Sequence, residues 1–239
     1  MNFEWNENTI RWYQDAERYT GFYKNIARLV APKMAGYTTL CDIGCGPGLV
    51  DIELSRYMEA ITCIDVNPCA IAALERNIRQ NNITNIKPLL LDCRQISENW
   101  DVIFLSFFGS GELERFLPHC KKLVAVVSKK SEPQLFPEKY RKFRKNIVEE
   151  VEKHLQGAGI PYNLTNAELE FGQPFCTEED AGEFVRALCR NISCDELDEF
   201  LRTHLVRTGE EEFPFYLPHK KSVGIFEIEG KSAVMNRKL

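Results

Sequence analysis

The sequence lacks any apolar run approaching the roughly 20 residues that a helix needs to span a bilayer, which argues against a membrane protein. Glycine and proline are also scarce, at 14 and 11 of 239 residues, while hydrophobic residues make up 44% of the chain. This composition excludes a disordered or collagen-like chain and supports a substantial core. Positive charge is not in excess either, because 30 basic residues stand against 35 acidic ones and give a net charge of −5. An overall positive field for binding nucleic acid is therefore absent, which leaves only a local basic patch for that purpose.

Targeting signals and metal-binding motifs are missing as well. The first residues are polar and acidic, with no basic flank leading into an apolar run, so we expect no signal peptide. The nine cysteines form no C-x-x-C pair and no histidine follows at zinc-finger distance, so no metal site is expected. We therefore expect a cytoplasmic protein whose thiols are mostly buried and free, with Cys41 and Cys63 inside strands as small apolar residues.

What is present is a regular alternation of strand and helix patterns, which predicts an α/β fold with a mostly parallel sheet of seven strands. The expected strands are 38–43, 60–65, 87–91, 101–106, 123–128, 162–171 and 222–228. The expected helices are 7–30, 49–58, 68–81, 113–116, 138–156, 177–190 and 194–208. No repeat or linker interrupts this order, so a single decorated domain over residues 1–239 is predicted.

The most informative segment is the glycine-rich stretch 40–49, LCDIGCGPGL, where a strand turns sharply into a helix. Gly44 and Gly46 remove β-carbons where a ligand must press against the backbone, and Gly48 eases the start of the helix toward the strand. The helix N-terminus directs free N–H groups toward whatever lies above the turn. A glycine-rich loop alone is a weak signal, and its context decides its meaning.

That context is a series of acidic residues at strand ends. The second strand ends in Asp65, 21 residues after Gly44, which is the spacing of an acidic residue that binds ribose hydroxyls. The third strand is followed by Asp92, and the first contains Asp42 next to its end. Because adjacent parallel strands present their carboxyl ends along one edge, we expect these three carboxylates to line a ligand site there.

This arrangement resembles the class I S-adenosylmethionine (SAM) dependent methyltransferases over about residues 38–128. The stretch 42–48 fits the D/E-x-G-x-G-x-G loop of that family, Asp65-Val66 fits its acidic motif after the second strand, and Asp92-Cys93 fits its adenine-contacting position. The resemblance implies a Rossmann-like, three-layer α/β/α sandwich with SAM as the cofactor and S-adenosylhomocysteine as the product. A nicotinamide dehydrogenase is the nearest rival, but its G-x-G-x-x-G spacing and its pyrophosphate do not suit this loop or the preceding Asp42.

The resemblance also implies roles for individual residues. Gly44 and Gly46 would lie against the methionine part of SAM, and Asp42 would organise its amino group. Asp65 would accept hydrogen bonds from both ribose hydroxyls, and Asp92 would accept one from the adenine amino group. The expected cofactor-binding residues are Asp42, Gly44, Cys45, Gly46, Gly48, Asp65, Val66, Asp92, Cys93 and Ser106.

The segment after the fourth strand, 106–110, bears on the methyl acceptor. Families that methylate exocyclic or amide nitrogens usually carry Asn or Asp, then Pro-Pro and an aromatic residue here, whereas this chain reads Ser-Phe-Phe-Gly-Ser. The departure argues against methylation of adenine or of a glutamine amide. Phe107 and Phe108 either wall an apolar acceptor pocket or are ordinary core residues.

The N-terminal helix is unusually aromatic, with seven aromatic residues among the first 23. Small-molecule methyltransferases of the resembled family often use such a helix as a lid, and aromatic rings stabilise a sulfonium. Tyr13 and Tyr19 are the candidates to face a ligand, although burial of the helix on the domain accounts for the pattern equally. The expected parts of the domain are a helical lid (1–36), a SAM-binding half (37–130) and a substrate-side half (131–239) with a helical insertion at about 174–210, before the last strand.

We expect an in-line displacement in which a small-molecule acceptor attacks the sulfonium methyl, with orientation and desolvation as the main contributions of the protein. No general base is legible in the sequence, and the oligomeric state stays open. One alternative is an RNA methyltransferase that uses a basic cluster at 139–145, made of Lys139, Arg141, Lys142, Arg144 and Lys145. Another is a SAM-binding sensor or partner subunit without turnover.

Overall fold

The computed structural model describes residues 4–109, 111–129, 135–140 and 147–231, which fall into two compact units. One unit, called here the insertion unit, draws on 1–22, 131–145 and 168–221. The other, called the sheet unit, draws on 23–130, 146–167 and 222–239. The organisation as one domain with a lid, a cofactor half and a substrate half stays a prediction.

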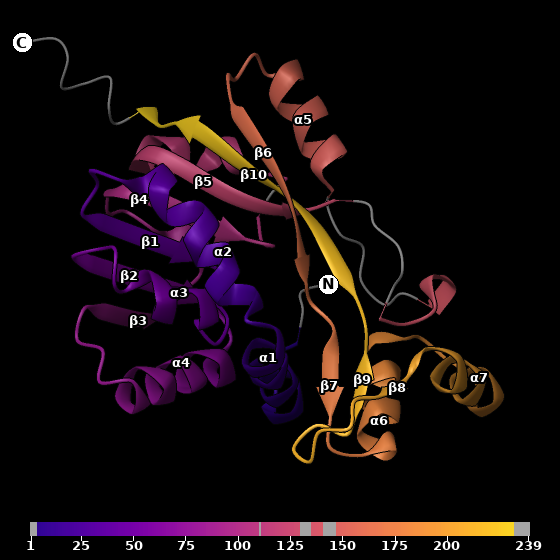
Figure 1. The fold of residues 1–239 in the computed structure, drawn as a ribbon. Helices are drawn as coiled ribbons and strands as arrows, with labels where there is room; N and C mark the ends of the chain where they lie inside the picture. The colour runs from indigo at the N-terminus through magenta and orange to yellow at the C-terminus, as the bar shows by residue number, and fades with distance from the viewer. Residues whose placement is uncertain (1–3, 110, 130–134, 141–146, 232–239) are drawn as a thin grey trace, which may run out of the picture. The chain divides into compact units, whose positions relative to one another are not determined.

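The sheet unit is built around seven strands in the order β3-β2-β1-β4-β5-β10-β6 (Figure 1). These strands are β1 (Thr39–Ile43), β2 (Ala60–Asp65), β3 (Ile86–Leu90), β4 (Trp100–Ser106), β5 (Cys120–Ser128), β6 (Asn163–Glu170) and β10 (Lys220–Glu229). Neighbours from β3 to β5 pair in parallel, whereas β10 runs antiparallel to β5. The predicted α/β fold with a mostly parallel sheet of seven strands is confirmed.

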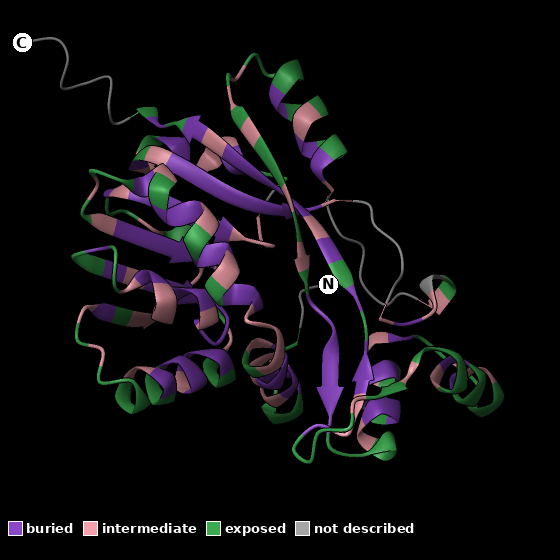
Figure 2. Ribbon diagram, viewed as in Figure 1, coloured by how far each residue is buried: buried purple, intermediate pink, exposed green. Residues whose placement is uncertain are grey.

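Burial along the central strands explains why this sheet is stable. Successive residues of β4 and β5 are buried, rather than every second one, which is typical of a sheet covered on both faces (Figure 2). On one face Cys41 and Ile43 join a cluster that includes Val148 and Val151 from α5 (Val148–Gly157). The other helical elements of this unit are α2 (Phe22–Val30, of which Phe22 belongs to the insertion unit), η1 (Ala31–Met34), α3 (Leu49–Leu54), α4 (Pro68–Gln80), η2 (Cys93–Gln95), η3 (Leu113–Arg115) and η4 (Leu117–His119).

Local sequence signals determine where α4 begins, and one of its side chains connects it to the glycine-rich loop. The Asn67 side chain accepts hydrogen bonds from the N–H groups of Cys69 at 2.9 Å and Ala70 at 3.2 Å, and Pro68 supplies the preset φ of a first helical residue. Further along the helix, the Asn77 side-chain amide donates to the carbonyl of Pro47 at 2.9 Å. This bond ties α4 to the glycine-rich loop between β1 and α3.

The insertion unit brings the N-terminal helix together with residues more than 150 positions away. Its elements are α1 (Glu7–Thr20), η5 (Glu138–Tyr140), α6 (Glu178–Leu188), α7 (Cys194–His204) and an antiparallel sheet ordered β7-β9-β8, with β7 (Gln173–Phe175), β8 (Val206–Arg207) and β9 (Phe215–Leu217). Asp180 of α6 accepts from Arg11 at 2.6 and 2.9 Å and from Trp12 Nε1 at 2.8 Å. The Trp12 ring also packs edge-on against Phe184, with 5.3 Å between centroids. These contacts give α1 and α6 a common core.

The expected element boundaries need several corrections. The single helix expected over 7–30 is wrong, because Gly21 adopts φ 64° and ends α1 before α2 begins. The helix expected over 49–58 ends at Leu54, and the one expected over 113–116 is a short 3-10 turn. The single helix expected over 138–156 is wrong, because 138–140 form the 3-10 turn η5 and Ile147 is extended just before α5 begins. Residues 141–146 lie outside the described part of the chain. Among the described helices, none has both the length and the apolar character to cross a membrane.

Asp101, at the start of β4, anchors the amino-terminal edge of the sheet. One of its carboxylate oxygens accepts from the N–H groups of Thr38 and Thr39, each at 3.0 Å, and the other pairs with Lys121 at 2.7 Å. Burial alone would raise the pKa of Asp101, but the ion pair and these hydrogen bonds outweigh it and hold the pKa well below its usual range.

We expect Asp101→Asn to lower the free energy of unfolding at pH 7 by about 1–3 kcal/mol, because Asn loses the charge and one acceptor oxygen. A depressed folded-state pKa contributes stability above the unfolded value of about 3.9, and this stability is lost as the pH falls through the folded value. Wild type and variant should therefore converge in acid. Urea unfolding at pH 7 and pH 3 measures this, and a difference that is the same at both would contradict it.

Candidate functional site

The glycine-rich loop joins the carboxyl end of β1 to α3, and its backbone is left-handed at all three glycines. Gly44, Gly46 and Gly48 have φ of 77°, 56° and 71°. The N–H of Gly44 donates to the carbonyl of Ile64 at 2.7 Å, which holds the start of the loop against β2. Side chains other than glycine rarely adopt such φ values, so the sequence motif and the loop conformation require each other.

Gly44 of this loop packs closely against Phe108. A β-carbon placed on Gly44 would lie 2.4 Å from Cγ of Phe108. The ring of Phe108 therefore lies directly on the loop backbone, and it also packs against the core cluster of the sheet unit. Both expectations for Phe108, a pocket wall and a core residue, are compatible with this position.

Asp65, at the end of β2, connects that strand to the loop. One carboxylate oxygen accepts from the N–H of Gly46 at 2.9 Å and the other accepts from the N–H of Asn67 at 2.8 Å. Each oxygen has two lone pairs, so both retain capacity to accept from a ligand hydroxyl. The residue after it, Val66, is 54% exposed, which is unusual for a valine that follows a buried strand.

Buried oxygens without partners lie at the same edge. Asp42 of β1 is 1% exposed, and neither of its carboxylate oxygens has a hydrogen-bond partner among the described residues. The hydroxyl oxygen of Ser106, at the end of β4, is likewise buried and unpartnered. Because a buried polar atom without a partner is costly, these atoms indicate a place where a polar ligand completes the structure.

The end of β3 supplies the third carboxylate. Asp92 caps η2, and its Oδ1 accepts from the N–H of Arg94 at 2.8 Å. Asp92 and Cys93 are both half-buried. Since β1, β2 and β3 are adjacent and parallel, Asp42, Asp65 and Asp92 lie at one edge of the sheet.

Phe107 marks the end of β4 with an unusual backbone. Its φ is 58°, a value that an aromatic side chain adopts only under constraint, and the following Gly109 has φ 61°. Such strain clusters at ligand sites, where the surrounding structure enforces it. The segment after Ser106 is therefore held in a defined shape and not left as an ordinary connection.

The two candidates from the N-terminal helix lie in the insertion unit. Tyr13 packs between Trp5 and Phe171, with centroid distances of 4.9 and 5.9 Å, and burial raises the pKa of its phenol to about 12. Tyr19 packs on Tyr216 at 4.8 Å and on Phe213 at 5.9 Å. Their role toward a ligand stays a prediction.

Most of the basic cluster at 139–145 lies outside the described residues. Its described member Lys139 pairs with Glu196 at 2.7 Å within the insertion unit. The nine cysteines are all free, and Cys41 and Cys63 are buried in their strands as expected.

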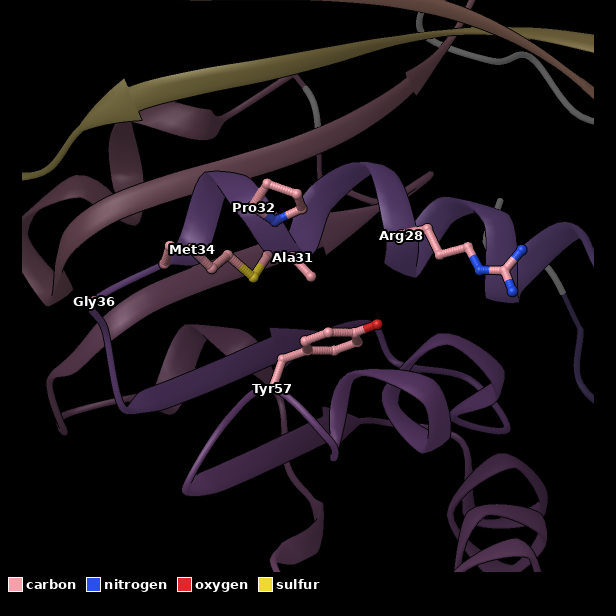
Figure 3. A pocket seen from close by; sticks show the side chains of 7 residues that line it. Arg28, Ala31, Pro32, Met34, Gly36 and Tyr57 are labelled. Carbon is pink, nitrogen blue, oxygen red and sulfur yellow. The ribbon is translucent and has the colours of Figure 1, made fainter.

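A pocket elsewhere in the sheet unit does not belong to this site. It has a volume of about 400 Å³ and lies between η1 and the turn after α3, where Arg28 and Tyr57 bring polar groups to a mostly apolar lining (Figure 3). Residues 36 and 57 come shortly before β1 and β2 begin, so the pocket is near the amino ends of these strands. Ligands of open α/β sheets bind at the carboxyl ends, where Asp42 and Asp65 lie.

One residue of the site escaped the sequence reasoning. Asp51, in α3, is fully buried and its two carboxylate oxygens have no hydrogen-bond partner among the described residues. The sequence gives only a weak indication of its burial: the carboxylate lies between two apolar residues, Val50 and Ile52. An acidic residue in the first turn of a helix is ordinarily expected to be exposed.

Comparison with known proteins finds similarity over the segment that carries the glycine-rich loop. Residues 40–126 match a family model described as a methyltransferase domain. A curated relative, the tRNA (guanine(37)-N(1))-methyltransferase Trm5b of Pyrococcus abyssi, is 37% identical over 65 residues, which make up 27% of this chain and 20% of that enzyme. The match thus spans about a fifth of the relative's length.

Solved structures resemble the chain over nearly its whole length. A putative methyltransferase of Bacillus halodurans has a TM-score of 0.58 at 13% identity, with 86% of this chain and 98% of that one covered. A SAM-dependent methyltransferase of Aquifex aeolicus has a TM-score of 0.55 at 16% identity, with 95% and 100% covered. At these identities the likeness is one of fold.

Proposed function

We propose that this chain transfers the methyl group of SAM to a small-molecule acceptor. The premise is that residues 40–126 match the model of a methyltransferase domain and that the fold is that of SAM-dependent methyltransferases. The observation that carries the proposal is the convergence of three carboxylates, from Asp42, Asp65 and Asp92, at the strand edge beside the glycine loop. No pyrophosphate would be tolerated so close to Asp42, whereas a cationic nucleoside is favoured there.

The residues at this edge fit SAM on grounds of the structure itself. The unpartnered oxygens of Asp42 and Ser106 provide acceptors for its amino-acid part, and the spare lone pairs of Asp65 provide acceptors for its ribose. The exposed Val66 provides an apolar contact for the adenine, and Asp92 an acceptor for its amino group. When bound, SAM supplies an activated methyl on a positively charged sulfur.

The chain's own contribution is to orient the reactants and to exclude water. The left-handed loop lets the backbone approach the methionine part closely, and the Phe108 ring packs against the loop at Gly44. Phe107 and Ser106 then delimit the space at the end of β4 in which an acceptor is aligned behind the methyl. Such alignment is the main requirement of an in-line displacement from an already activated donor.

A specific observation favours RNA as a second candidate acceptor. Trm5b of Pyrococcus abyssi, the curated relative matched over 65 residues, is named for methylation of a guanine in tRNA. The net charge of −5 favours the small molecule, because RNA binding rests on neutralising phosphates.

Calorimetry with SAM, S-adenosylhomocysteine and NADH tests the cofactor. We expect micromolar or tighter binding of the first two and none of NADH. Methyl transfer from labelled SAM to a metabolite pool and, in parallel, to unmodified tRNA tests the acceptor. Labelling of metabolites supports the proposal, labelling of tRNA alone supports the second candidate, and binding of NADH in place of SAM overturns both.

A further inference from the structure

Asp51 and Asp42 form a buried pair of carboxyl groups beneath the glycine-rich loop. Asp42 comes two residues before Gly44, and Asp51 comes three residues after Gly48, so the two enter from opposite ends of the loop. Asp51 is 0% and Asp42 1% exposed, and the two side chains contact each other. None of their four oxygens accepts from a described donor.

Among the residues that the structure describes, the neighbours that act on the pair carry no compensating positive charge. Cys63 is the register partner of Asp42 on β2, and its thiol contacts Asp51 and the thiol of Cys45. The other titratable groups that act on Asp42 are Cys45 and, more weakly, Asp65, and both increase the negative potential. The groups found around the pair are thus thiols and carboxyls, and no set of three that could hold a metal occurs among the described residues.

Two ionised carboxylates cannot coexist in contact in a dry site, so the pair must keep a proton. Burial raises the pKa of both groups, and for Asp42 the charge of Asp51 raises it further. The two groups titrate as one unit that carries a single negative charge and one shared proton around neutral pH. The buried pair lowers the stability of the ligand-free protein, because two apolar side chains of the same volume would avoid its desolvation cost.

We propose that Asp51 is a cofactor-binding residue, and that the Asp42–Asp51 pair takes up the α-ammonium group of SAM in exchange for its shared proton. The inference rests on the proposed function, since it assigns a new residue to the same cofactor. In the exchange no covalent bond to carbon or sulfur changes. The ammonium group, with three N–H donors, replaces one O–H donor between the two carboxylates, and the displaced proton goes to solvent.

The exchange explains why the chain retains Asp51 in the short helix α3, although burying its carboxyl group costs desolvation free energy. A single carboxylate can accept only part of what an ammonium donates, whereas two carboxylates can accept all three N–H bonds. The cluster is placed to act on the amino-acid part of the ligand and not on its base. Asp42 and Asp51 flank the loop, whereas Asp92 follows β3, which lies two strands away from β1.

The ligand-free protein provides the first test, through Asp51→Asn. The asparagine keeps the shape and donates one hydrogen bond to Asp42, so the variant should fold. A folded-state pKa raised above the unfolded value contributes stability that is lost as the pH rises through it. The variant, in which only the buried Asp42 remains of the pair, should lose less stability than wild type. We expect its melting temperature to exceed that of wild type by about 3–6 °C at pH 8 and by much less at pH 5.

Glu53→Gln is the matched control, because Glu53 lies on the same helix and pairs with Arg56 at 3.1 Å outside the cluster. Its effect on the melting temperature should not increase between pH 5 and pH 8. An Asp51→Asn effect that is equally independent of pH would show that the pair holds no shared proton, and it would overturn the inference.

Ligand binding provides the second test, by calorimetry at pH 6.5 in two buffers with different heats of ionisation, because an α-amino group is mostly protonated at that pH. We expect Asp51→Asn to weaken SAM and S-adenosylhomocysteine about tenfold, and to leave methylthioadenosine, which lacks the ammonium group, within twofold of wild type. Wild type should release a proton on binding SAM between pH 6 and 7, where the α-amino group of SAM is already mostly protonated, and the variant should not.

The possible outcomes separate this inference from the proposed function. Wild type that binds SAM without proton release, or a variant that weakens all three nucleosides equally, overturns the role of Asp51 and leaves the methyltransferase assignment intact. Wild type that binds neither SAM nor S-adenosylhomocysteine overturns the proposed function, and the assignment of Asp51 fails with it.

Discussion

In an Asp65→Ala variant, affinity for SAM is expected to fall by about 100-fold, which corresponds to about 2.7 kcal/mol. Two effects add. The carboxylate is expected to accept from the ribose hydroxyls, and it also accepts from the N–H groups of Gly46 and Asn67, which hold the loop and the following turn in place. Removing it therefore takes away a ligand contact and loosens the backbone that lies against the methionine part.

Asp65→Asn keeps the volume of the side chain but changes its hydrogen bonding, so it separates the two effects. The asparagine keeps one acceptor oxygen, but its NH2 group must face either the Gly46 N–H or the Asn67 N–H, so donor meets donor. We expect this variant to bind SAM nearly as poorly as the alanine variant. Calorimetry measures both, with Glu75→Gln on α4 as a control whose carboxylate is half exposed and lies near Arg79 at 3.9 Å. Unchanged SAM affinity in the alanine variant would refute the assignment to the ribose.

The parts of the fold that the sequence predicts well are those with a local cause. The strands from 38 to 128 are short apolar runs bounded by glycine, proline or acidic residues, and each appears within about three residues of its expected position. The loop conformation follows from glycines at three positions that require positive φ. Asp42, Asp65 and Asp92 meet at one edge because parallel strands place their carboxyl ends together.

The parts that could not be predicted depend on partners far away in the chain. The three-stranded sheet β7-β9-β8 was missed because its strands have two or three residues each, too few for any periodicity. Gly21 lay inside a continuous helical pattern, and nothing local shows that its φ is positive. Asp180 is one of several acidic residues at the start of the helix predicted over 177–190, and nothing local shows that it binds Arg11, 169 positions away.

The burial of Asp51 at the site could not be predicted from the sequence for the same reason. In the sequence it is one more acidic residue in the first turn of a helix, where such residues are common and exposed. Its burial depends on how closely α3 approaches β1 and β2, which is set by the loop and by the packing of Leu74 against Gly48. A pattern of residue types carries no information about that distance.

Gly44→Ala is expected to have the largest effect on the fold of the site, lowering the free energy of unfolding by about 3 kcal/mol and abolishing measurable SAM binding. Two costs combine. The positive φ of 77° disfavours any β-carbon by about 1–2 kcal/mol, and the new carbon would lie 2.4 Å from Phe108 Cγ, which forces the ring or the loop to move.

Gly36→Ala isolates the first of these costs. Gly36 has φ 87°, yet a β-carbon there meets nothing within 4 Å, so its alanine variant should lose only about 1–2 kcal/mol and bind SAM normally. A double variant tests the contact with the ring. When Phe108→Ala is already present, adding Gly44→Ala should lower the free energy of unfolding only by the backbone strain, because the ring is gone. Urea unfolding of the variants gives this coupling, and SAM calorimetry tells whether the loop recovers its shape. If Gly44→Ala costs no more than Gly36→Ala, then Phe108 does not support the loop and must be assigned to the core alone.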